Sequence, residues 1–114
     1  PLLMVALATA LNAQESRNSS IKALHLLKSS LRYDKKNSNT WFQLAIAFSG
    51  IDDLGNAELS TAERHFLTGN VKMASFHAKK SLKYLQESSI SKLRAEDILL
   101  DSKNKAKWKK RCPV

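Results

Sequence analysis

Three histidines, one cysteine and one pair of adjacent aspartates are the side chains of this 114-residue sequence that could support catalysis or bind a metal. A zinc protease of the H-E-x-x-H type needs two histidines one helical turn apart and a glutamate that acts as general base. Neither His25, His65 nor His77 is followed by Glu, and no two of them are four positions apart. The sequence therefore predicts no metal site and no cofactor in this chain.

The other reactive groups form no familiar catalytic pattern. Cys112 lies beside Lys110 and Arg111, which favour a thiolate, but no base is placed to activate it. Asp52 and Asp53 are expected in the loop and first turn of a helix, where negative charge suits the helix dipole. Phosphate-binding and serine-hydrolase motifs are absent, since the only glycines are Gly50, Gly55 and Gly69. We expect no enzymatic activity from this chain.

Apolar residues recur at helical spacing through the whole chain, and both prolines lie at its ends. The predicted helix faces are Leu3, Ala6, Ala10 and Ala13; Ile21, Leu24, Leu27 and Leu31; Trp41, Leu44, Ala45 and Phe48; residues 53–68; Val71, Ala74, Ala78, Leu82 and Leu85; and Leu93, Ile98 and Leu99. Start and stop signals are Ser19 or Ser20, Asn39 or Thr40, Gly69-Asn70, and Ser88-Ser89. The pattern predicts an all-α fold.

A repeat of 34 residues is the next signal. Trp41, Leu44, Ala45 and Phe48 match the first-helix signature of a tetratricopeptide repeat, and Ala57 stands at the small position of the second helix. Ala23 stands 34 positions before Ala57, and a further copy follows Gly69, although the copies compete for residues 56–68. We predict a stack of about three antiparallel helical hairpins over residues 1–102, followed by a basic tail over 103–114.

The order of these segments is similar to a known family. The stretches at residues 41–48, 57–64 and 93–98 resemble the C-terminal repeat region of periplasmic M48-family zinc metalloproteases of Gram-negative bacteria. The resemblance covers about residues 1–100, and the chain departs from it at Lys92 and in the basic tail. It implies a periplasmic, chaperone-like parent protease that acts in outer-membrane quality control, with its zinc in an upstream domain. The residues themselves do not fix the compartment, so a cytoplasmic location stays open as the alternative.

In the repeat register, Trp41 and Leu44 point into the stack while Asn39, Phe42 and Ile46 face the concave side. Apolar residues on that side would form a groove for an extended or helical peptide. The alternative is that a neighbouring helix of the full protein covers them. The first hypothesis is a protein-interaction module that recruits a protein or peptide partner, such as its own protease domain or outer-membrane proteins.

The net charge of +9 raises the question of a nucleic-acid partner. Six basic residues follow the last acid, Asp101, so residues 1–102 carry a net charge of only +3. The tail can be a solvated helix end, a contact for an anionic surface, or a nucleic-acid arm, which is the less favoured partner. The apolar opening of residues 1–16 also resembles a signal-peptide core, but it is too short to span a bilayer, and we expect a first repeat helix there.

Overall fold

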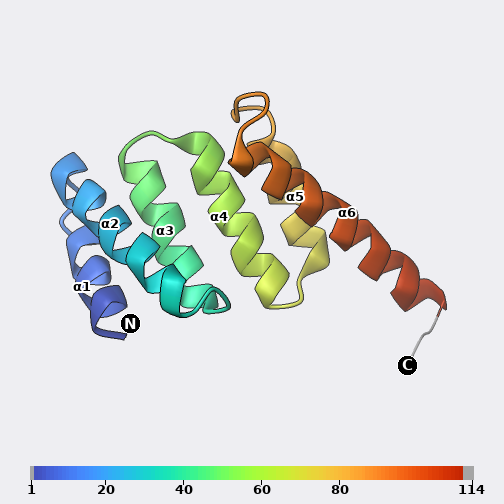
Figure 1. Ribbon diagram of the computed structural model, residues 1–114, viewed down its shortest axis with the longest axis horizontal. Coiled ribbons are helices and arrows are strands. Elements are labelled where there is room, and N and C mark those ends of the chain that lie inside the picture. The colour runs from blue at the N-terminus through green and yellow to red at the C-terminus, as the bar shows by residue number, and fades with distance from the viewer. Residues whose placement is uncertain (1, 112–114) are drawn as a thin grey trace.

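The computed structural model describes the backbone of residues 2–111 and the side chains of residues 2–107. Cys112 and the end of the predicted tail lie outside the described residues. Within them the chain is entirely helical, which confirms the predicted fold class, and it contains no strand (Figure 1). The helices are α1 (Leu2–Asn12), α2 (Arg17–Tyr33), α3 (Ser38–Gly50), α4 (Leu54–Leu67), α5 (Val71–Ser81) and α6 (Ile90–Arg111).

Side-chain caps fix most of the helix starts. The oxygens of Asp53 and Asn70 accept hydrogen bonds from the third residue after each, and the Ser89 hydroxyl accepts one from the backbone N–H of Lys92. Two predicted caps were wrong. Helix α2 starts earlier than expected because Ser16 caps it, and Asn37 caps α3. The predicted caps, Ser19 or Ser20 and Asn39 or Thr40, lie inside the helices.

The turn between α4 and α5 follows the predicted stop signal. Gly69 has φ of 82°, and the N–H groups of Gly69 and Asn70 donate to the carbonyls of Phe66 and His65 at 3.3 and 2.9 Å. This pair of bonds is the Schellman motif, which needs a left-handed residue after the helix. Asn70 then caps α5, so one turn both ends α4 and starts its antiparallel neighbour.

The helices form two three-helix units, each with its own core. Helices α1, α2 and α3 pack on one another, and so do α4, α5 and α6, while the α3–α4 contact joins the units (Figure 1). The first core consists of Val5, Ala8, Ala23, Leu24, Leu27, Leu44 and Ala47. The second core consists of Leu59, Ala62, Ala74, Ala78, Ala95 and Ile98. No apolar cluster of the described residues spans both units.

The two units bury equivalent positions 51 residues apart. Ala23, Leu27 and Ser30 of α2 are buried, and so are Ala74, Ala78 and Ser81 of α5. Each unit also ties its first helix to its third by a buried polar pair. Asn12 donates to Gln43 Oε1 at 2.9 Å, and 51 positions later Arg94 donates to Glu63 Oε1 at 2.9 and 2.6 Å. The structure therefore repeats a helix–helix–helix unit.

The predicted face of the first helix was wrong. Val5, Ala8 and Asn12 are the buried residues of α1, whereas Leu3 is 81% exposed and Ala6, Ala10 and Ala13 are also exposed. The helix has no charged residue, so its apolar pattern does not single out one face. Contact with α2 and α3 selects the Val5 side, because Asn12 can then bond Gln43.

Two further predicted core residues are exposed. Ile21 is 37% exposed and Leu93 is 58% exposed, whereas Leu24, Leu27 and Ile98 on the same helices are buried as expected. Leu93 lies one position from Arg94, whose contact with Glu63 fixes which side of α6 faces α4.

Among the described helices none is long and apolar enough to cross a membrane.

Candidate functional site

A groove runs between the two units. Its walls come from α2 and the first turns of α6, and its floor comes from α3 and α4. Two hollows of about 460 and 470 Å³ share four lining residues, so they are one continuous depression. The shared residues are Leu31, Trp41, Glu63 and Arg94. The groove is larger than packing defects inside a core, and it is the site that the structure offers for a ligand.

Trp41 is the central aromatic residue of the groove. Its indole Nε1 donates to the backbone carbonyl of Lys35 at 2.9 Å, which holds the ring in one orientation. Leu31 and Phe48 lie beside it, and all three side chains are only partly buried. A fixed aromatic plane with apolar neighbours is a good contact for an apolar side chain of a partner.

Glu63 and Arg94 cross the groove between the two hollows. The Glu63 side chain is 10% exposed and the Arg94 side chain is 40% exposed, so the carboxylate is buried while the guanidinium reaches water. Arg94 also lies 5.9 Å from the centre of the Phe66 ring, and Lys105 Nζ lies 4.0 Å from the same centre. The opposite charges of Glu63 and Arg94 therefore cancel in the middle of the groove.

The rim of the groove is basic at one end. Lys35 and Lys36 line the second hollow, and Lys28 lines the first, where its Nζ lies 5.7 Å from the centre of the Phe48 ring. None of these three lysines takes part in the ion pairs between described side chains. The acids that line the first hollow are Asp53, which caps α4, and Glu63, which is paired with Arg94. The groove thus combines an apolar floor with an end that favours negative charge.

The predicted site residues lie on a different side of α3. Phe42 and Ile46 are 40% and 39% exposed and Asn39 is exposed, but none of the three lines the groove. The Arg64 guanidinium lies 4.6 Å from the centre of the Phe42 ring, so α4 partly covers this face. Trp41, which was expected to point into the stack, packs against the first core and also lines both hollows of the groove.

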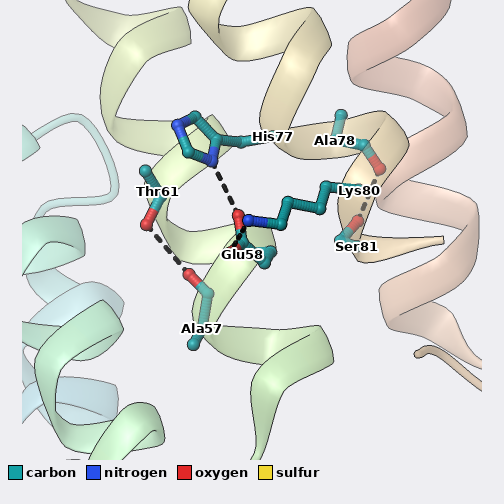
Figure 2. A network of polar contacts seen from close by, with 7 residues as sticks. All are labelled: Ala57, Glu58, Thr61, His77, Ala78, Lys80 and Ser81. Carbon is teal, nitrogen blue, oxygen red and sulfur yellow. Dashed lines mark hydrogen bonds and ion pairs between the residues drawn. The ribbon is translucent and has the colours of Figure 1, made fainter. Parts of the chain in front are cut away.

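The fold also brings together two histidines that lie twelve positions apart in sequence. The rings of His65 and His77 stack at 5.5 Å with 9° between their planes, because the Gly69 turn sets α4 and α5 antiparallel. His77 Nδ1 lies 2.6 Å from Glu58 Oε2, and Lys80 Nζ lies 3.5 Å from the other oxygen of Glu58 (Figure 2). Spacing along one helix could not reveal this cluster.

Burial lowers the pKa of His65 below its ordinary value, and the neighbouring His77 and Arg64 lower it further. His65 is therefore neutral near pH 7. A search of the described residues finds no group of three His, Cys, Asp or Glu side chains that could hold a metal ion. The cluster links α4 to α5 through partly buried side chains.

Helix α6 continues through the start of the predicted tail, so the boundary placed at residue 102 falls within one helix. Lys103, Lys105 and Lys107 are exposed on it.

Comparison with known proteins assigns no family: no family model, no curated protein and no solved structure matches this chain.

Proposed function

We propose that this chain is a protein-interaction domain whose groove binds a short peptide segment with apolar side chains and an acidic end. The observation that carries the proposal is the continuous groove around Trp41, with Lys35 and Lys36 at one end, neither of which forms an ion pair with another described side chain. Apolar contacts come from Trp41, Leu31 and Phe48. The two lysines attract the acidic end of the peptide and so determine its direction in the groove. This is the helix-groove mode of peptide recognition, in which apolar anchors give affinity and rim charges give orientation.

The experiment uses a fluorescent synthetic peptide of about 12 residues with leucine and phenylalanine in the middle and glutamates at one end, a length typical of groove-binding segments. We expect saturable binding in anisotropy titrations. Leu31→Ser should weaken it at least about tenfold, which corresponds to about 1.4 kcal/mol. Lys35→Glu with Lys36→Glu should weaken binding of this peptide but not of a version with lysines in place of the glutamates.

The matched control is Phe42→Ser with Ile46→Ser, which changes two partly exposed apolar residues outside the groove. This variant should bind as the unchanged chain does. If it loses binding while Leu31→Ser keeps it, the site is the face of Asn39, Phe42 and Ile46 that the repeat register predicts. If no variant alters binding, the peptide is held elsewhere and the groove proposal fails.

We also propose that the helices are diverged tetratricopeptide repeats, on the strength of the signature at Trp41, Leu44, Ala45 and Phe48. The resemblance to M48-family proteases supports a further proposal: a periplasmic parent protein whose zinc-protease domain precedes this chain. The coding sequence upstream of Pro1 tests it, since an H-E-x-x-H motif and a signal peptide should be found there. An upstream sequence without that motif contradicts the protease assignment and leaves the peptide-binding proposal untouched.

The alternative function is binding of nucleic acid or an anionic surface by the basic end of α6. The exposed Lys103, Lys105 and Lys107 favour it. Binding of a labelled single-stranded oligonucleotide should then fall steeply with salt and disappear when residues 103–111 are removed. Weak binding with a shallow salt dependence would argue against this function.

A further inference from the structure

The contact between α3 and α4 joins the two units. It indicates which kind of helix surface the outermost helices can bind. On α4, Ala57 and Ser60 are 7% and 2% exposed, although neither belongs to the core of the second unit. Arg64, one turn beyond Ser60, lies over the Phe42 ring of α3. Helix α3 therefore contacts the side of α4 that carries Ala57 and Arg64, and this contact joins the units.

The equivalent side of α1 has no partner among the described residues. Fifty-one positions before Ala57, Ser60 and Arg64 stand Ala6 and Thr9 of α1 and Ala13, which directly follows α1, and all three are exposed. Leu3 and Leu7 flank them and are 81% and 51% exposed. We call Leu3, Ala6, Leu7, Ala10 and Ala13 the outer face of α1. It contains no charged residue, and such an apolar face is unusual on a free surface.

Helix α6 is the counterpart of α3 in the second unit. Phe42, Ile46 and Ser49 correspond to Leu93, Asp97 and Leu100, which we call the outer face of α6. Leu93 and Leu100 are 58% and 59% exposed. Asp97 is equivalent to Ile46, which is 39% exposed although it lies next to the α3–α4 contact. The Asp97 carboxylate would therefore remain in water in the contact between copies. Ile90, at the start of α6, lies at the border between this face and the groove, whereas Ser91 and Arg94 lie on the groove side.

We propose that copies of this chain associate head to tail, with the outer face of α6 in one copy against the outer face of α1 in the next. The contact would repeat the α3–α4 junction, and Leu93 would lie against Ala13 as Phe42 lies against Arg64. Helix α1 lies at one end of the longest dimension, 47 Å, and α6 runs from beside α4 to the other end (Figure 1). Because the two faces are different surfaces, each copy can contact one copy on either side, which gives an open chain or a closed ring.

The charge of the chain sets the conditions for the test. Each copy carries +9, so copies repel one another, and association should strengthen as salt rises. We expect sedimentation equilibrium to give an average mass that climbs above 12.8 kDa between about 1 and about 500 µM. An average mass that stays at the monomer value at the highest concentration and in high salt overturns the proposal.

Two variants separate the head-to-tail contact from a symmetric one. Leu3→Glu with Leu7→Glu alters only the α1 face, and Leu93→Lys with Leu100→Lys alters only the α6 face. Each variant alone should be monomeric, whereas their mixture should form a one-to-one dimer that grows no further, because each supplies one intact face. If the α6 variant still associates by itself, the contact is not head to tail. Tyr33→Glu, at a residue 70% exposed elsewhere, is the control and should associate normally.

Crosslinking gives a measurement that does not depend on disruptive substitutions. In a Cys112→Ser background, Leu93→Cys and Ala13→Cys chains are mixed under oxidising conditions. A disulfide needs Cα atoms within about 7 Å, so in an equimolar mixture covalent heterodimers should form in far more than the roughly twofold excess over either homodimer that random pairing gives. Yields at or below that statistical excess would mean random collision and would refute the contact.

Discussion

Replacing Arg94 with methionine should show whether the buried polar pair of the second unit stabilises the fold. The substitution keeps most of the aliphatic stem and removes the donors that bond Glu63 Oε1 at 2.9 and 2.6 Å. Breaking a buried ion pair from one side costs about 3–5 kcal/mol, because the remaining charge is left without a partner. Since the Arg94 side chain is 40% exposed, water can reach the carboxylate, and we expect a smaller loss of about 2–3 kcal/mol.

The assay is urea unfolding followed by circular dichroism at 222 nm. With a slope of about 2 kcal/mol per molar urea, the midpoint should fall by about 1–1.5 M. The double variant Glu63→Leu with Arg94→Met removes the buried charge as well, so it should be more stable than Arg94→Met alone. A loss below about 0.5 kcal/mol would mean that the pair behaves as a surface ion pair. Purely additive effects of the two substitutions would also refute the argument.

Three other predictions test separate parts of the structure. A Cβ at Gly50 would lie 2.1 Å from Ser20 Oγ, so Gly50→Ala should destabilise the chain by about 1–3 kcal/mol in urea unfolding, and adding Ser20→Gly should restore most of it. Because the pKa of His65 is lowered in the folded chain, stability should be constant above about pH 6.5 and fall as the pH drops below it. His65→Gln should flatten that fall in thermal melts at pH 5 and 7, whereas His25→Gln should not. Zinc should leave the melting temperature unchanged, and a stabilisation that saturates at one zinc per chain would show a site that we have missed.

The sequence by itself determined the helical elements of this protein. Periodic apolar residues and few glycines predict an all-α chain, and both ends of α4 and the start of α5 follow from Asp53, Gly69 and Asn70. The end of α5 does not follow, because its predicted face ran to Leu85 and the helix stops at Ser81. These signals are local, because a cap or a left-handed turn acts on backbone groups within four residues. Sequence also predicted that Phe42 and Ile46 stay partly exposed, although whether they bind a partner remains a prediction.

Only the tertiary structure decided which faces of the helices meet. Helix α1 offers two apolar sides, and contact with α2 and α3 buries Val5 and Ala8 while it leaves Leu3 in water. The Glu63–Arg94 and Asn12–Gln43 pairs each join residues 31 positions apart. The groove around Trp41 likewise depends on how four helices are placed. Such contacts are set by how helices cross and by which side chains fill the space between them, and the residues on one helix do not fix that geometry.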